Sequence, residues 1–193
     1  MLETFDQVLS DAARRLQDGA TNRRSPMHTP VVGTADADLR TMVLRGFERA
    51  SWTLRFHTDA RAPKVRAVER DPAAGVLLYN KTAKVQLRCR GTARIERVGE
   101  AVEAAWSEST NFARRCYLGE GPGAASDEPT SGLPPAFEGE EPDDARLLPA
   151  RDNFAILLVR IETLDWFHLA HTGHRRALFD LTGDEPQGRW IAP

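Results

Sequence analysis

Alternating apolar and polar residues over the first half of the chain predict a series of short antiparallel strands. The alternation is clearest in Lys84–Glu96, where Val85 and Leu87 point to one face and Gln86 and Arg88 to the other. Only a few residues separate the first three strands, and this favours an antiparallel meander. The strands expected in this half are Pro30–Thr34, Leu39–Phe47, Trp52–His57, Ala73–Tyr79 and Lys84–Glu96.

Apolar residues at helical spacing predict helices beside these strands. In the first helix Phe5 and Val8 share one face, and Gly19 is expected to end it. In the second, Pro63 has the backbone angle that suits a first helical turn, and Pro72 prevents extension beyond Asp71. The predicted helices cover Thr4–Asp18, Pro63–Arg70 and Glu100–Cys116.

The chain loses its periodicity between Leu118 and Ala150, where prolines, glycines and acidic residues accumulate. Such a stretch inside a compact domain is usually functional or disordered, so we expect a long mobile loop at residues 118–150. Three further strands are expected after it, at Phe154–Ile161, Thr163–His171 and Arg176–Leu181. Together these elements predict one domain over residues 1–193, mainly β with peripheral helices and about six to eight strands.

Composition excludes several classes of protein. The 193 residues carry 26 Lys and Arg against 28 Asp and Glu, so no basic field argues for nucleic acid or an anionic membrane. The acidic N-terminus does not resemble a signal peptide, and the longest apolar run, Phe154–Val159, is too short to cross a bilayer. We therefore expect a soluble cytoplasmic protein without nucleic-acid or membrane partners, in which any anion site is local.

The sequence gives little evidence for a metal site or for hydrolase chemistry. Cys89 and Cys116 lack the spacing of a metal motif, and we interpret both as buried thiols. In a continuous strand His171 would point away from His168 and His174, so a shared metal site is not expected. The sequence contains no phosphate-binding glycine loop and no arrangement typical of a nucleophilic hydrolase.

A local anion site is predicted where the strand ending at Thr58 turns into the helix that begins at Pro63. A helix N-terminus favours an anion, and Thr58 would add a hydroxyl and Lys64 a positive charge. The alternative is that these charges are merely solvated. We expect a phosphate group at this corner.

Three segments in order, the basic strand Leu39–Phe47, the Thr58–Lys64 turn and Gln86–Gly91, resemble the pyridoxamine 5′-phosphate oxidase-like family of FMN-binding split β-barrels. The resemblance extends from about His28 to Pro193, apart from the region after Trp106. It implies a Greek-key antiparallel split β-barrel, FMN as the cofactor, and a two-fold symmetric homodimer with FMN at the interface.

The resemblance also implies roles for individual residues. Arg40 and Lys64 would bind the FMN phosphate with the Thr58 hydroxyl, and the backbone of Thr41–Val43 would run beside the flavin ring. Gln86 would contact the flavin, often from the partner chain. Near the C-terminus the register stays open between Trp166 and Phe167 and between Arg175 and Arg176. The implied cofactor-binding set is Arg40, Thr41, Met42, Val43, Arg45, His57, Thr58, Lys64, Gln86, Trp166 and Arg176.

The sequence departs from the family pattern at three positions of the implied site. Pro63 replaces an arginine that contacts the phosphate, and Arg45 replaces a lysine that touches flavin and substrate. His57 replaces a tyrosine and either covers the flavin or simply ends a strand. No residue is assigned a catalytic role.

The function implied is an FMN-dependent oxidoreductase acting on an unidentified small molecule. The alternative is a flavin- or haem-binding protein without turnover. Pyridoxamine 5′-phosphate oxidase activity itself is expected to be poor. The family's substrate-phosphate residues are Tyr, Arg and Ser, and here Trp106, Thr110 and Arg114 occupy those positions. In addition, Thr172-Gly173 precede His174 where the family has an arginine.

Overall fold

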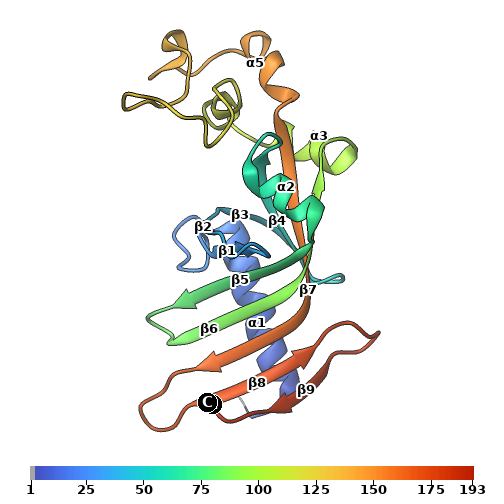
Figure 1. Ribbon diagram of the computed structural model, residues 1–193. Helices are drawn as coiled ribbons and strands as arrows, with labels where there is room; N and C mark the ends of the chain where they lie inside the picture. Colours follow the sequence, from blue (N-terminus) through green and yellow to red (C-terminus); the bar gives the residue numbers. More distant parts are fainter. Residues whose placement is uncertain (1–2) are drawn as a thin grey trace.

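The computed structural model describes residues 3–193 and is built on a curled antiparallel sheet (Figure 1). Within the described residues the sheet has nine strands, rather than six to eight, in the order β2-β1-β5-β6-β7-β4-β3, with β8 beside β7 and β9 beside β8. The strands are β1 Val31–Thr34, β2 Leu39–Thr41, β3 Leu44–Glu48, β4 Thr53–Asp59, β5 Ala73–Asn80, β6 Val85–Glu96, β7 Phe154–His168, β8 Arg175–Asp180 and β9 Gln187–Trp190. A mainly β fold with peripheral helices is thus confirmed.

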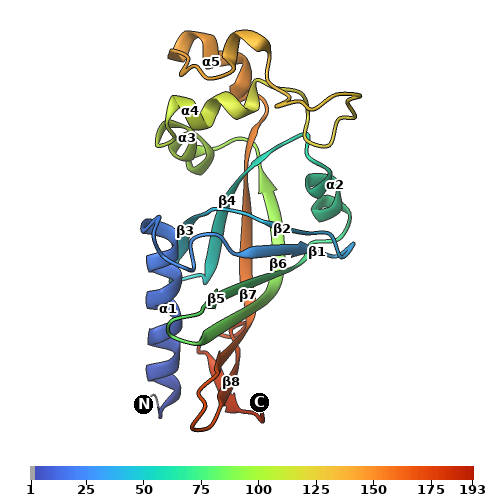
Figure 2. The same cartoon turned by 90° about the vertical axis from the view of Figure 1, so that its left-hand side faces the viewer.

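The 15-residue strand β7 connects the parts of the sheet. One edge of β7 pairs with β6 along most of its length, and the other pairs first with β4 and then with β8. Because β4 and β8 share one edge of β7, the sheet curls into a half-barrel. The β8–β9 hairpin lies at one end of the molecule, and α3, α4 and α5 lie at the other (Figures 1 and 2).

Helix α1 (Phe5–Thr21) covers the concave face of the sheet (Figure 2). Thr4 and Gln7 form a capping box at its start, and its buried face includes Val8 and Leu16. The helix continues past Gly19, so the prediction that Gly19 ends it was wrong. A Cβ at Gly19 would lie 2.8 Å from the Met27 carbonyl oxygen, so the glycine instead allows the returning chain to pack against the helix.

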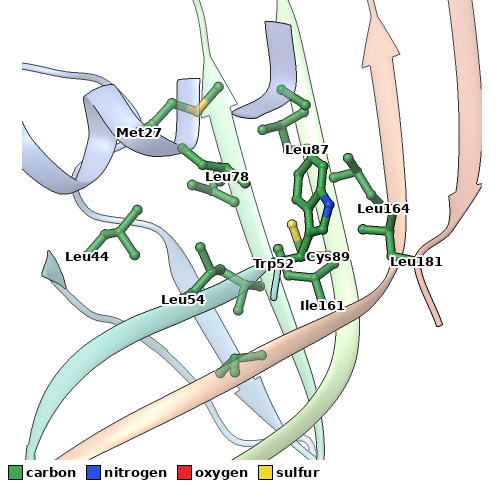
Figure 3. Close-up of a cluster of buried hydrophobic side chains, with 14 of the residues drawn as sticks. Met27, Leu44, Trp52, Leu54, Leu78, Leu87, Cys89, Ile161, Leu164 and Leu181 are labelled. Carbon is green, nitrogen blue, oxygen red and sulfur yellow. The ribbon is translucent and has the colours of Figure 1, made fainter. Parts of the chain in front are cut away.

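Two groups of buried side chains flank the sheet. The main core lies between α1 and the concave face, and ten of its residues are labelled in Figure 3. The second group, the upper cluster, lies where α3 (Glu100–Ser107) packs on the opposite face of β7. It consists of Val102, Ala105, Phe154, Ile156 and Leu158, with Trp106 and Tyr117 packed against it.

The predicted helix Glu100–Cys116 is interrupted. Helix α3 ends at Ser107, and the Thr110 side chain caps a separate short helix, α4 (Asn111–Arg114), which is followed by η1 (Arg115–Tyr117). The break allows the chain to change direction above β4.

The region predicted as a loop at residues 118–150 is largely irregular, but it contains η2 (Pro135–Phe137) and the first seven residues of α5 (Asp144–Arg151). Arg115, only 8% exposed, donates hydrogen bonds to the carbonyl oxygens of Phe137 (3.0 Å) and Glu140 (2.7 Å). The segment therefore has defined contacts with the helices, while its mobility stays a prediction.

Three strand predictions also change. Leu39–Phe47 is divided into β2 and β3, because the N–H groups of Met42 and Leu44 donate to the carbonyls of Pro30 and His28. The segments predicted on either side of Glu162 are one strand, β7, and β9 was not predicted. Helix α2 (Pro63–Arg70) has its predicted bounds. Within residues 3–193 no helix has the length and apolarity needed to span a membrane.

Candidate cofactor site

Lys64 lies in the first turn of α2, directly above the end of β4. Its Nζ is 3.5 Å from the Thr58 hydroxyl oxygen. Burial lowers the pKa of Lys64, and repulsion from Arg40 lowers it further, against weaker attraction from Asp59 and Asp38. An anion between the two cations would relieve both effects.

Arg40 extends from β2 toward the same corner. One Nη donates to the Thr34 hydroxyl at 3.1 Å, and the other forms an ion pair with Asp38. The Arg40 side chain is 17% exposed and that of Asp38 is 60% exposed, so the counter-ion is the more solvated partner. We call Arg40, Thr58 and Lys64 the phosphate corner.

The nearest buried acid is already neutralised. Asp59, 7% exposed, forms an ion pair with Arg61 at 2.7 Å and accepts the backbone N–H of Arg61 at 2.8 Å. The negative charge of Asp59 is therefore neutralised by Arg61 within the turn before α2. The phosphate corner therefore keeps a net positive charge suited to a phosphate group.

A second set of predicted residues lies on the convex face of the sheet. In the strand register Gln86 is paired with Phe167, and Phe167 with Arg176, so the three side chains form a row across β6, β7 and β8. We call these three residues the outer row. Tyr79, paired with Gln86 and 45% exposed, extends the row onto β5.

The strand register distinguishes the two aromatic candidates. Trp166 is 2% exposed in the main core, and its indole N–H donates to Asp11 of α1 at 3.2 Å. Phe167, the next residue, shares the face of Gln86 and Arg176. Side chains alternate along a strand, so Trp166 and Gln86 lie on opposite faces.

Asp165 holds the arginine of the outer row. It is 3% exposed and accepts hydrogen bonds from Arg176 Nε (3.0 Å) and Nη2 (2.8 Å), and it also pairs with Arg88. We did not predict Asp165 as part of the site. The sequence feature that could have indicated Asp165 is an acidic residue within a strand otherwise rich in apolar residues.

The remaining predicted residues lie apart from both sets. Thr41 is the last residue of β2, and Met42 and Val43 form the connection to β3, in which Met42 is buried. Arg45 and His57 line a pocket on the other face of β4 from Thr58. Among residues 3–193 no cluster of His, Cys, Asp or Glu side chains is arranged to hold a metal ion.

Residues 3–97 match the family model for the FMN-binding domain of pyridoxamine 5′-phosphate oxidase. Residues 3–97 are thus similar to the FMN-binding domain of that family. The matched range contains the phosphate corner and Gln86, whereas Phe167 and Arg176 lie outside it. FMN is the cofactor of this family. A search of the curated proteins gave no match.

Solved structures of the family share the fold. A pyridoxamine 5′-phosphate oxidase-related, FMN-binding protein from Nostoc punctiforme superposes with a TM-score of 0.75 and 23% identity over 100% of both chains. PhzG from Burkholderia lata, solved with tetrahydrophenazine-1-carboxylic acid, has a TM-score of 0.65 and 15% identity over 96% of this chain and 92% of that one. A protein related to general stress protein 26 from Clostridium acetobutylicum has a TM-score of 0.57 and 10% identity over 94% and 100%. The split β-barrel fold predicted from the sequence is confirmed.

Proposed function

We propose that this FMN-binding protein is an FMN-dependent oxidoreductase acting on a small molecule, and that two copies pair with FMN between them. The observation that carries the proposal is the separation of the two predicted sets of residues. The phosphate corner lies at the end of the half-barrel, whereas the outer row lies on the convex face. One chain would supply the corner and the other would supply the row to the same flavin.

An apolar trough on the convex face supports the pairing. It encloses about 420 Å³ beside the outer row and is lined in part by Leu39, Leu77 and Leu178. Leu39 is 68% exposed and Leu77 is 41% exposed, which is unusual for leucine side chains grouped in one place. A second copy would remove this apolar surface from water.

The residues present fit the chemistry of FMN. Arg40 and Lys64 supply positive charge for a phosphate dianion, with Thr58 as a hydrogen-bond donor. In the outer row Gln86 offers an amide to the polar edge of the ring and Phe167 offers an aromatic surface. When bound, FMN supplies hydride or single-electron transfer, while the protein orients the ring and shields it from water.

The absorbance spectrum of protein purified without added cofactor tests the proposal. We expect a flavin spectrum and a dimer in sedimentation experiments. If the protein retains no FMN and binds none on addition, the cofactor assignment fails. A monomer that holds FMN would contradict the interface. Reduction of the bound flavin by NADH or NADPH would support an enzyme, whereas a flavin that accepts no hydride would favour a binding protein without turnover.

We also expect poor pyridoxamine 5′-phosphate oxidase activity. Arg114 of α4 stands at one of the three positions where the family has a substrate-phosphate residue. Its guanidinium group donates hydrogen bonds to the carbonyl oxygens of Trp106 (2.8 Å) and Ser107 (2.9 Å) and forms an ion pair with Asp144 at 3.2 Å. It is therefore committed to joining α3, α4 and α5. Pyridoxal phosphate and hydrogen peroxide should form slowly from pyridoxamine phosphate, and turnover like that of a dedicated oxidase would contradict this expectation.

A further inference from the structure

Asp165 lies on the convex face of the sheet, where it lines the apolar trough between two arginines. The strand register pairs it with Arg88 of β6, and Arg176 reaches it from β8, diagonally across from Asp165. Strands β6, β7 and β8 lie side by side in Figure 1, so three adjacent strands each supply one charged side chain. We call Arg88, Asp165 and Arg176 the ionic triad.

Both arginines contact Asp165 through the same edge of the guanidinium group. Arg176 donates from Nε to Oδ1 at 3.0 Å and from Nη2 to Oδ2 at 2.8 Å. Arg88 donates from Nε to Oδ2 at 3.0 Å, and its Nη2 contacts the same oxygen. Among residues 3–193 neither Nη1 atom takes part in a hydrogen bond or an ion pair. Each arginine therefore has a free donor on the side away from Asp165.

The members of the ionic triad differ in exposure. The side chain of Asp165 is 4% exposed, whereas those of Arg176 and Arg88 are 22% and 44% exposed. The two guanidinium groups repel each other, and the carboxylate that both contact holds them together. With two positive charges and one negative charge, the triad has a net charge of +1.

Positive charge predominates throughout the trough. Its charged lining residues are three arginines, Arg88, Arg90 and Arg176, and one acid, Asp165. If a second copy covers this face, as proposed, the excess positive charge is removed from water. Burying an uncompensated charge is unfavourable. A group that carries negative charge beside the triad would offset this cost.

The ionic triad also fixes one member of the outer row. Cζ of Arg176 lies 5.7 Å from the centre of the Phe167 ring, and Phe167 is paired with Gln86. Asp165 holds Arg176 in this place through two hydrogen bonds. It therefore affects the surface that the proposed function assigns to the flavin.

We propose that Asp165 is a positioning residue for the flavin: it holds Arg88 and Arg176 together, and the net positive charge of the triad favours reduced over oxidised FMN. The inference rests on the proposed function, which assigns the outer row to the flavin. Uptake of a hydride, two electrons with one proton, gives the flavin ring one negative charge, whereas the oxidised ring is neutral. Charge beside the ring tunes its electronic properties. The triad should thus make the reduction potential of bound FMN less negative.

Spectroelectrochemical titration of the FMN-loaded protein tests the effect of charge. Arg88→Gln should weaken binding of reduced FMN about tenfold relative to oxidised FMN, which lowers the potential of this two-electron couple by about 30 mV. Arg94→Gln is the matched control, since Arg94 lies on the same strand, is 63% exposed and pairs with Glu96 instead. An unchanged potential in Arg88→Gln would overturn the proposal.

Variants of Asp165 separate positioning from charge. Asp165→Asn removes a negative charge, and this change alone would raise the potential. We expect a lower potential instead, because repulsion separates the two arginines once the carboxylate is lost. Asp165→Glu keeps the carboxylate and should return the potential toward the wild-type value. A higher potential in Asp165→Asn would contradict the positioning role.

A variant with weakened packing controls for a merely structural effect. Val85 is 3% exposed in the main core, on the concave face of β6. Val85→Ala should therefore lower the melting temperature and leave the potential unchanged. If Val85→Ala lowered the potential as much as Asp165→Asn, the shift would reflect lost stability and the positioning role would fail.

NMR of the full-length protein as purified gives a readout that does not depend on the flavin spectrum. The Nε–H signals of Arg88 and Arg176 are assigned by their loss in Arg88→Gln and Arg176→Gln. Both protons should exchange slowly with water in the wild-type protein and rapidly in Asp165→Asn, because Asp165 accepts both. Slow exchange of both protons in Asp165→Asn would show that another group positions the arginines.

Failure of this inference can be distinguished from failure of the proposed function. A protein that binds no FMN has no flavin absorbance, and that result would contradict the proposed function and this inference with it. A protein that binds FMN, but whose potential is the same in Arg88→Gln, would contradict only the role of the ionic triad.

Discussion

Lys64 carries its charge where burial and the nearby Arg40 both oppose it. Its Nζ has one polar contact, the Thr58 hydroxyl at 3.5 Å, and no carboxylate forms an ion pair with it in residues 3–193. A buried cation without an ion-pair partner destabilises the folded protein, and a bound anion would reduce this destabilisation. The FMN phosphate is the anion that we propose for the corner.

Lys64→Ala should weaken FMN binding about tenfold or more, because a charge-assisted contact is worth roughly 1.5–3 kcal/mol. Lys81→Ala is the matched control, since Lys81 is exposed in the turn between β5 and β6. A fluorescence titration of apoprotein with FMN measures both affinities. Equal affinities of the two variants would place the phosphate elsewhere.

His57 predicts a pH dependence of stability. Its pKa falls from the usual 6.5 to about 4 in the folded protein. As the pH drops from about 6.5 to about 4, the unfolded chain binds a proton that the folded protein does not. The free energy of unfolding therefore decreases, at most by about 1.4 kcal/mol per pH unit. Below the pKa of His57 in the folded protein, this histidine lowers the free energy of unfolding no further.

Urea denaturation between pH 4 and pH 7 measures this effect. We expect His57→Gln to flatten the pH dependence within that window, whereas His171→Gln, an exposed change, should leave it intact. The same slope in the wild-type protein and in His57→Gln would show that other groups cause the loss.

The proximity of Thr58 and Lys64 could be predicted because the strand, turn and helix that carry them are consecutive in the chain, whereas Arg40 comes from β2. The side chains of Thr58 and Lys64 meet through local geometry alone. The choice between Trp166 and Phe167 could not be made from the sequence, since it depends on which face of β7 meets α1. Arg55, which lines the same pocket as Arg45 and His57, was not predicted, because its place there depends on the bulge at Arg45 and on the room that Gly46 leaves.

Strands β6 and β7 remain paired through an irregularity at Gly91. The register shifts between Arg90 and Gly91, and a Cβ at Gly91 would lie 1.9 Å from the Arg160 carbonyl oxygen. No L side chain fits there without movement of the backbone. The glycine thus permits the close approach that the strongly curled sheet requires.

Gly91→Ala should lower the free energy of unfolding by more than about 2 kcal/mol, because the contact would be with backbone rather than with a flexible side chain. Gly75→Ala on β5 is the matched control, since its nearest contact would be an ordinary 3.9 Å. Denaturant unfolding compares the two variants. Similar losses would show that the sheet can absorb the extra methyl group.

Continuous elements were predictable from periodicity, but their interruptions were not. Helix α2 has its predicted bounds because Pro63 and Asp71-Pro72 mark both ends in the sequence. The break between β2 and β3 arises from hydrogen bonds with Pro30 and His28, which are tertiary contacts. Strand β9 is short and mostly exposed, and its place depends on pairing with β8 rather than on its own pattern.

At the scale of the whole molecule, the convex face of the sheet is the proposed contact surface of the dimer. It brings the apolar trough and the outer row together on one surface. Leu77→Lys should weaken the dimer and, with it, FMN binding, because a charge would replace apolar surface at the proposed contact.

Sedimentation velocity with and without FMN measures both effects. Val98→Lys is the control, since Val98 is 81% exposed and lies outside the trough. A Leu77→Lys dimer with unchanged FMN affinity would exclude this face as the interface.

Strand β7 contributes to both groups of buried side chains. Phe154 and Ile156 belong to the upper cluster, while Leu157 and Leu164 belong to the main core. Neither group can lose its packing without disturbing the backbone that supports the other. In deuterium exchange, the amides of β7 should therefore exchange together, through global opening, rather than as two separately melting units. The helical segment that interrupts the sheet between β6 and β7 would be anchored at its base to the most slowly exchanging strand of the protein.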